Sequence, residues 1–299
     1  MSALVNTARG ETVAVERATR GRAARAWRLA RAYPTATVGA ILLALLVAVA
    51  IFAPFLGTTD PAALMPARRA RVPSAANWFG TDLLGRDLYS RVIYGTRVSL
   101  MVGFSVAFIA TAIGLLIGLT AGFIRAVDNT VMRAMDGLMS IPSILLAVAL
   151  MALTRGSVGN VIIAITIAEI PRVSRLARSV TLSLREQPFI DAAVSIGART
   201  PTIMFKHVLP NTLAPLMVQA TYICASAMII EAILSFIGAG TPPNIPSWGN
   251  IMSEGRALWQ VKPYIILFPA AFLSLAVLAV NLLGDGLRDA LDPKMARNL

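Results

Sequence analysis

Uncharged stretches long enough to cross a membrane recur along the chain, separated by segments that carry most of the charge. A helix needs about 20 apolar residues to cross the roughly 30 Å hydrocarbon core of a bilayer. Four windows reach that length clearly, and two are weaker because one contains Pro142 and the other contains Glu169 and Pro171. Spans that pack on other helices or line a cavity tolerate such residues. The pattern predicts an all-α integral membrane protein with six transmembrane helices, at Val38–Phe55, Val98–Phe123, Gly137–Thr154, Val158–Leu182, Leu213–Ile230 and Tyr264–Gly284.

The segments between these windows divide the chain into regions. The first is a basic tail, residues 1–33, in which arginines and apolar residues from Arg22 to Tyr33 fall on different helical arcs. That arrangement suits a helix on the inner membrane surface, and a disordered basic tail is the alternative. We then expect a first transmembrane helix at 34–56, an extracytoplasmic loop at 57–97, a core of five helices at 98–284 with a cytoplasmic loop at 172–212, and a cytoplasmic tail at 285–299.

Composition supports a bilayer as the solvent of most of this surface. Of the 299 residues 57% are hydrophobic and 14% are charged, and the mean hydropathy is +0.71. The net charge of +12 does not indicate a nucleic-acid partner, because binding a phosphate backbone needs a solvated basic face. Membrane lipid, and not nucleic acid, is the expected neighbour.

The arginine excess instead indicates how the chain is oriented. If the N-terminus is cytoplasmic, the inner segments hold about twice as many Lys and Arg residues as the outer ones, as the positive-inside rule requires. We therefore expect a multi-pass protein of the inner or plasma membrane with both termini cytoplasmic. The basic loop at 57–97 is the one segment that does not fit this rule well.

Several kinds of chemistry are missing from the sequence. A single cysteine, Cys224, and a single histidine, His207, exclude an intramolecular disulfide and a Cys/His metal cluster. No lysine follows a glycine, so the chain has no phosphate-binding P-loop, and no Gly-x-Ser-x-Gly elbow occurs. We expect no catalytic residue, no bound cofactor or metal, and no ATP hydrolysis by this chain.

Two acids and a glycine repeat stand out inside the predicted spans. Charged groups are costly there unless they face a cavity or a partner, so Glu169 and Glu231 either form buried hydrogen bonds or ion pairs, or face a substrate pathway or gate. For Glu169 the candidate cations are Arg172 and Arg175. Glycines at every fourth position, Gly114, Gly118 and Gly122, share one helix face and indicate close helix packing, with a hinge as the alternative.

The long inner loop contains signals for two short helices. The first would run from Asp191 to Ile196 and end at Gly197, since glycine readily adopts the left-handed conformation that terminates a helix. The second would begin with Thr200 as its cap and Pro201 in its first turn. Two short helices at a membrane face form either a docking surface or an ordinary connector.

Four motifs in this chain resemble those of one transporter family. Asp191-Ala192-Ala193, Gly197 and Leu209-Pro210 match the Glu-Ala-Ala, Gly and Leu-Pro positions of ABC importer permeases, with Asp in place of Glu. Three further motifs resemble the C-type subunit of dipeptide, oligopeptide and nickel importers: Gly80-Thr-Asp-Leu-Leu-Gly-Arg-Asp87, Leu234-Ser-Phe-Ile-Gly-Ala-Gly-Thr241 with Ser247-Trp-Gly249, and Gly284-Asp-Gly-Leu-Arg-Asp-Ala-Leu-Asp-Pro293.

This resemblance implies a type I ABC importer permease fold with a cytoplasmic coupling helix at Asp191–Gly197. It also implies a homologous B-type second permease, two ATPase subunits that use ATP and Mg, an extracytoplasmic substrate-binding protein, and peptide transport by alternating access. Glu169-Ile170 stands where family members commonly have an aromatic residue before the proline, which weakens any transfer of substrate preference. A secondary transporter using its intramembrane carboxylates is the alternative function, and a membrane enzyme comes third.

Overall fold

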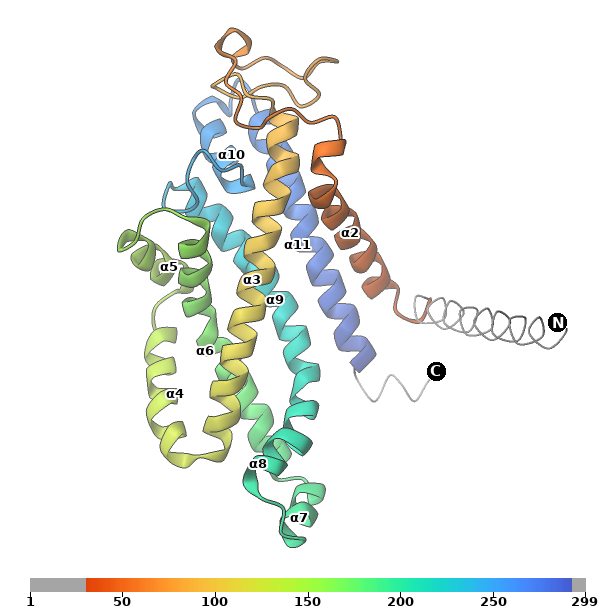
Figure 1. Cartoon of the computed structure of the whole chain (residues 1–299), viewed down its shortest axis with the longest axis vertical. Coiled ribbons are helices and arrows are strands. Elements are labelled where there is room, and N and C mark those ends of the chain that lie inside the picture. Colours follow the sequence, from red (N-terminus) through yellow and green to blue (C-terminus); the bar gives the residue numbers. More distant parts are fainter. Residues whose placement is uncertain (1–30, 292–299) are drawn as a thin grey trace, which may run out of the picture.

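A computed structural model describes residues 31–291, which form an elongated bundle of helices (Figure 1). The long helices are α2 (Pro34–Ile51), α3 (Leu88–Phe123), α6 (Val158–Arg185), α9 (Leu209–Phe236) and α11 (Tyr264–Leu291). Shorter helices connect them: α4 (Arg125–Met139), α5 (Ser143–Ala152), α7 (Pro188–Ser195), α8 (Thr200–Thr202) and α10 (Trp248–Gly255). The predicted surface helix from Arg22 and the last residues of the C-terminal tail lie largely outside the described residues.

The described helices reproduce the all-α membrane architecture but not a simple count of six spans. Four helical segments are long and apolar enough to cross a membrane, namely Pro34–Ile51, Leu88–Phe123, Thr200–Phe236 and Tyr264–Leu291, and the pair α4 and α5 makes a fifth if it is one bent span. Helix α6 has 28 residues, but its arginines and Glu169 keep it outside that group. Each predicted window thus falls on a described helix or helix pair. Two of them, on the α4 and α5 pair and on α6, are less clearly membrane-spanning than predicted.

The third predicted window is wrong as a single helix. Helices α4 and α5 meet at an angle of 90° across a break at residues 140–142. Pro142 is the N-cap of α5, and a proline disfavours the helical conformation of the residue before it, here Ile141. The break therefore follows from the proline that the sequence displays.

Helices α3 and α6 lie against each other along the three spaced glycines. A Cβ atom at Gly114 would lie 2.5 Å from the Val173 Cβ, and one at Gly118 would lie 2.5 Å from the Ala177 Cβ. At Gly122 the nearest atom, on Thr181, would be 2.4 Å away. The packing interpretation of the glycine repeat is confirmed, because no side chain fits between the two helices there.

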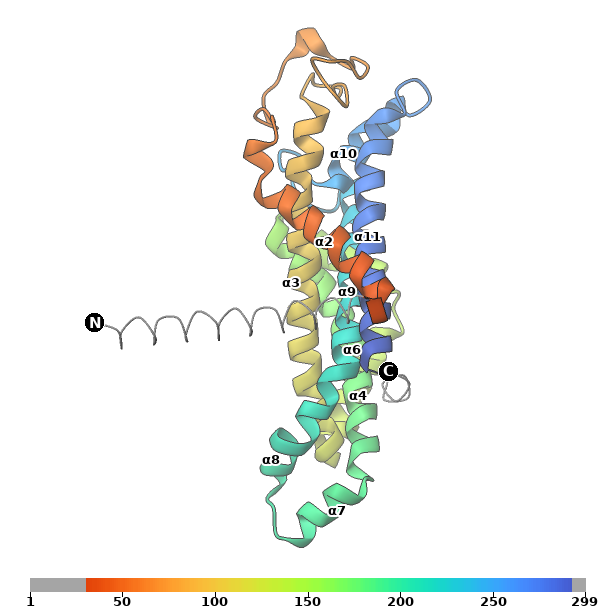
Figure 2. The ribbon, with the colours of Figure 1, turned by 90° about the vertical axis from the view of Figure 1, so that its right-hand side faces the viewer.

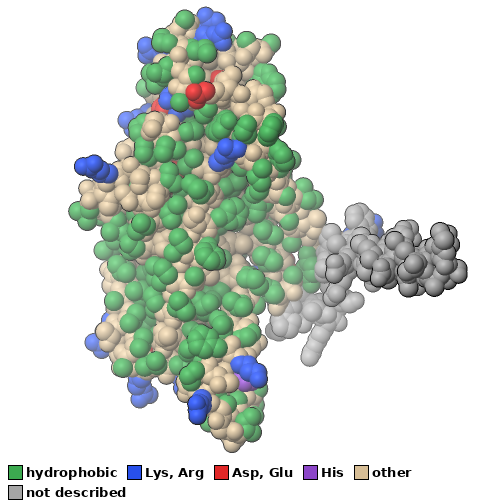
Figure 3. All heavy atoms as spheres, viewed as in Figure 1, with side chains coloured by type: hydrophobic (Ala, Val, Ile, Leu, Met, Phe, Trp, Pro, Cys, Tyr) green, Lys and Arg blue, Asp and Glu red, His purple; other side chains and the backbone are tan. Residues whose placement is uncertain are grey.

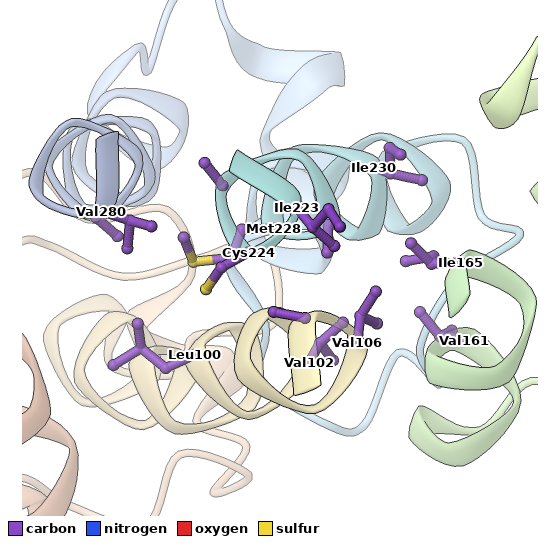
Figure 4. Close-up of a cluster of buried hydrophobic side chains, with 14 of the residues drawn as sticks. Leu100, Val102, Val106, Val161, Ile165, Ile223, Cys224, Met228, Ile230 and Val280 are labelled. Atoms are coloured by element: carbon purple, nitrogen blue, oxygen red, sulfur yellow. The ribbon is translucent and has the colours of Figure 1, made fainter. Parts of the chain in front are cut away.

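Buried apolar side chains from α3, α6, α9 and α11 form the main core (Figure 4). Leu100 and Val106 of α3, Ile165 of α6, Met228 of α9 and Val280 of α11 belong to it. Apolar side chains also cover the middle of the face seen in Figure 3, whereas Lys and Arg gather toward the two ends. A surface of this kind fits a bilayer and not bulk water.

The two ends of the bundle differ. Helices α7 and α8 form a tip at one end, and the loop at residues 57–87 lies with α10 at the other (Figures 1 and 2). We call these the α7 end and the α10 end. Helix α3 runs most of the length between them, since its 36 residues correspond to about 54 Å.

Candidate functional site

Helix α7 projects at the α7 end and stops at Gly197. Gly197 has a φ of 81°, its N–H donates to the Val194 carbonyl at 2.9 Å, and the Ala198 N–H donates to the Ala193 carbonyl at 3.0 Å. These two bonds form a Schellman motif, so the predicted left-handed stop is confirmed. The helix begins earlier than predicted, at Pro188 and not at Asp191, because proline is favoured in the first turn.

The two faces of α7 have different surroundings. Ile190 and Ala193 are buried against Leu119 of α3 and against Ile203 and Val208 beyond the tip. Asp191 and Ala192 are exposed, and Asp191 lies in the first turn, where a negative charge faces the positive helix end. Apolar side chains are also exposed on the tip: Phe189 (43%), Val194 (57%), Ile196 (86%) and Phe205 (53%).

The second predicted helix does begin at Thr200, with Pro201 in its first turn, but it is not a separate short helix. Helix α8 continues through a π-helical segment, Ile203–Val208, into α9, and Arg199 rather than Thr200 is its N-cap. The Leu209 N–H bonds to the carbonyl of Met204, five residues earlier, in the wide turn just before Pro210. Proline supplies no N–H and its ring crowds the carbonyl four residues back, which accounts for the widening. Leu209 packs on the buried cluster of the tip.

Glu169 is buried on α6. One of its oxygens lies 3.3 Å from Nη1 of Arg172, and the other accepts a 3.4 Å hydrogen bond from the Ser226 hydroxyl of α9. Of the two cations considered for it, Arg172 is the partner, whereas Arg175 pairs with Asp136 of α4 at 2.6 Å. The ion-pair interpretation of Glu169 therefore describes this conformation.

Glu231 is fully buried on α9. Its carboxylate accepts hydrogen bonds from Ser235 at 2.8 Å and from Ser99 of α3 at 3.3 Å. Neither Glu231 nor Glu169 lines the pocket of Trp78 and Tyr89 at the α10 end or the apolar cavities beside α2. The hypothesis that they face a substrate pathway or gate stays a prediction.

A buried charge cluster at the α10 end escaped the sequence analysis. Arg86 lies 2.6 Å from Asp82 and 2.6 Å from Glu254 of α10, and Arg91 lies 2.6 Å from Asp82 and also pairs with Glu254. Asp82 and Arg86 belong to the motif at 80–87, and Arg91 follows it in the first turn of α3, so these three residues stood close together in the sequence. Their partner Glu254 could not be recognised, because it lies far along the chain.

Apolar helices of spanning length and a helix that projects at one end are the features of a membrane-spanning protein. The chain belongs to the family of inner membrane components of binding-protein-dependent transport systems, whose model matches residues 110–297. A second model, the N-terminal TM domain of oligopeptide transport permease C, matches residues 22–73. The chain is thus a non-catalytic, multi-pass permease of an ABC transporter that works with ATPase and binding-protein partners.

Curated relatives cover most of the chain. It is 51% identical to a probable peptide ABC transporter permease protein of Sinorhizobium fredii, over 90% of this chain and 92% of the relative. It is 44% identical to a dipeptide transport system permease protein of Alkalihalophilus pseudofirmus, over 87% and 86%, and 44% identical to a glutathione transport system permease protein of Escherichia coli, over 90% and 89%.

A solved structure shows the same fold. The inward-facing methionine ABC transporter MetNI matches with a TM-score of 0.57 and 22% identity, over 68% of this chain and 96% of that one. The predicted type I importer permease fold is confirmed by this likeness.

Proposed function

We propose that this chain is one of two homologous permease subunits of an ATP-driven importer of peptides. Family membership places it in a binding-protein-dependent system, and the curated relatives described above are named for peptide, dipeptide and glutathione transport. Substrate would cross between this chain and a B-type partner by alternating access. The alternative of a secondary transporter has no support from the relatives.

The apolar tip at the α7 end is the observation that supports coupling to an ATPase. Ile196 is 86% exposed, yet it lies on a tip that extends beyond the apolar part of the bundle. Exposed apolar groups outside the membrane mark a protein-binding surface. Asp191, Ala192, Ala193 and Gly197 shape this surface, while Leu209 and Pro210 join it to α9.

This role sets the orientation and the partners. The α7 end would be cytoplasmic and would contact one of two ATPase subunits, which use ATP and Mg, while this chain binds no cofactor. The α10 end would face the substrate-binding protein outside. Both termini would then be cytoplasmic, with membrane lipid around the apolar helices and no nucleic acid bound.

Changing Ile196 to Asp tests the proposal. A charge at the centre of an apolar interface removes contacts that carry about 2 kcal/mol or more, roughly a thirtyfold loss of affinity. The tagged wild-type chain should co-purify with ATPases whose activity rises with loaded binding protein, and the peptide can be identified in that binding protein. The Ile196→Asp variant should insert normally and lose its ATPases.

A matched control is Val72→Asp, because Val72 is also an exposed apolar residue, at 56%, but lies in the loop at the α10 end. This variant should keep its ATPases. Purification of the wild-type chain without any ATPase would contradict the proposed function, and retention of ATPases by Ile196→Asp would contradict the docking role of the tip.

A further inference from the structure

Helix α10 lies beside the first half of α11. The uncharged part of α11, from Tyr264 to Gly284, has about 20 residues and a length of roughly 30 Å, which matches the hydrocarbon core. Gly255, at the end of α10, lies against Ile265 and Ile266 in the first turn of α11. Trp248, at the start of α10, packs on Phe272 with ring centroids 6.4 Å apart, about 10 Å further along α11 than the contacts of Gly255.

It follows that residues 237–255 are re-entrant: the chain leaves α9 within the membrane and α10 climbs back out with its N-terminus directed at the bilayer interior (Figure 1). Irregular backbone at that depth is tolerated only where it is buried in protein or lines a water-filled cavity. Here the irregular backbone before α10 finds a hydrogen-bond donor inside the protein. The side-chain amide of Asn250 donates to the carbonyls of Thr241 (3.2 Å), Pro242 (2.9 Å) and Ile245 (3.1 Å).

The Glu231 carboxylate is joined to residues 237–255 by two hydroxyl groups, one that contacts the first residue of α10 and one that contacts the loop before it. Ser99 accepts the Trp248 N–H at 3.4 Å and donates to Glu231 at 3.3 Å. Ser235 accepts the Thr241 N–H at 3.2 Å and donates to Glu231 at 2.8 Å. Each hydroxyl thus links a backbone N–H to the carboxylate through two consecutive hydrogen bonds.

The N-terminus of α10, where the helix dipole is positive, faces this carboxylate through the Ser99 hydroxyl. No Lys, Arg or His among the described residues forms an ion pair with Glu231, although its side chain is fully buried. A helix N-terminus carries a partial positive charge, whose effect is large where water is excluded. At the other end of α10, Glu254 is held by Arg86 and Arg91. Charged contacts therefore hold both ends of the helix.

We propose that residues 237–255 form a re-entrant plug that closes the translocation path at the α10 end, and that Glu231 is the positioning residue that seats it. This rests on the proposed function only in assuming that a path passes between these helices. Glu231 need not touch substrate for this role. It holds α10 down through charge, so the negative charge matters more than the shape of the side chain.

Comparison of Glu231→Gln with Glu231→Asp separates charge from shape. Glutamine keeps the size and removes the charge, whereas aspartate keeps the charge and leaves a small gap. If the charge of Glu231 holds the plug in place, the plug should stay closed in Glu231→Asp, as in wild type, and should be released in Glu231→Gln. A packing role requires the opposite order.

The readout is a cysteine beneath the plug. Ala227 is fully buried one turn before Glu231 on α9, and Ala227→Cys in a Cys224→Ser background supplies one thiol. Opened membranes expose both sides to a water-soluble maleimide, so the result does not depend on orientation. We expect labelling to be about tenfold faster with Glu231→Gln, as a shifted closed-to-open equilibrium requires, and unchanged with Glu231→Asp.

Asp285→Asn is the matched acid-to-amide control, because Asp285 accepts a hydrogen bond from Tyr222 at 2.6 Å far from α10. It should not alter labelling. Equal labelling in both Glu231 variants, or faster labelling with Asp than with Gln, would overturn the proposal. In the reconstituted complex Glu231→Gln should also raise ATP hydrolysis without binding protein. Absence of any ATPase partner of the wild-type chain would contradict the proposed function, while the labelling result stands by itself.

Discussion

Gly197 holds a backbone conformation that ordinary residues adopt only at a cost. Its φ of 81° lies in the left-handed region, where an L-residue other than glycine loses about 1–2 kcal/mol. Space is not the constraint within this chain, since a Cβ at Gly197 would meet nothing within 4 Å. The need for glycine therefore comes from the helix stop, and any need for a small residue comes from a docked partner.

Replacing Gly197 with Arg should separate these effects from insertion. The variant should reach the membrane in normal amount, because Gly197 lies outside every apolar helix, and should lose stimulated ATP hydrolysis in the reconstituted complex by about an order of magnitude. Gly57→Arg is the control, since Gly57 has a φ of 69° and open surroundings at the opposite end of the bundle. Normal stimulated hydrolysis in Gly197→Arg would show that the tip is only a connector.

At the scale of elements, the α3 and α6 pair depends on backbone contact. At Gly118 an added Cβ would lie 2.5 Å from the Ser174 carbonyl oxygen and 2.7 Å from the Arg178 nitrogen. Backbone atoms cannot move aside as side chains do, so a larger residue must push the helices apart. The cost of such overpacking is typically about 1–3 kcal/mol.

The Gly118→Leu variant should therefore be less stable than wild type when heated in detergent, as measured by the fraction that remains monodisperse on size exclusion. Gly159→Ala on α6 is the control, because its nearest neighbour, the Ser157 hydroxyl, would be 3.9 Å from the new Cβ. Equal heat resistance of Gly118→Leu and wild type would mean that these helices do not pack through the glycine face in the membrane.

The sequence predicted elements where a local rule decides them. Uncharged windows located α2, α9 and α11, the glycine period located the α3 contact face, and Gly197 located the end of α7. The sequence did not predict features that depend on contacts between distant residues or on how one helix continues into the next. Thr200 and Pro201 do start a helix, but the sequence did not predict that this helix continues through a π-helical segment into α9. The partner of Arg91 and the seat of α10 depend on residues more than 130 positions apart, as in Ser99 and Glu231, separated by 132.

At the scale of the whole molecule, the distribution of charge and the two distinct ends predict one topology. The loop at 57–87 is basic and yet belongs to the α10 end, so it opposes the positive-inside rule that the other segments follow. Arg86 of this loop and Arg91 of α3 are paired with Asp82 and Glu254 in the folded protein.

Single cysteines at the two ends test this topology in intact cells. Cys224 is only 2% exposed, and its replacement by serine gives a background without thiols. Ile196→Cys, at the α7 end, should react with a membrane-impermeant maleimide only after the membrane is opened. Trp78→Cys, at a loop position at the α10 end that is 62% exposed, should react in intact cells to the same final extent as in opened membranes. Labelling of Ile196→Cys in intact cells, or protection of Trp78→Cys until the membrane is opened, would reverse the orientation and with it the side on which α7 can meet an ATPase.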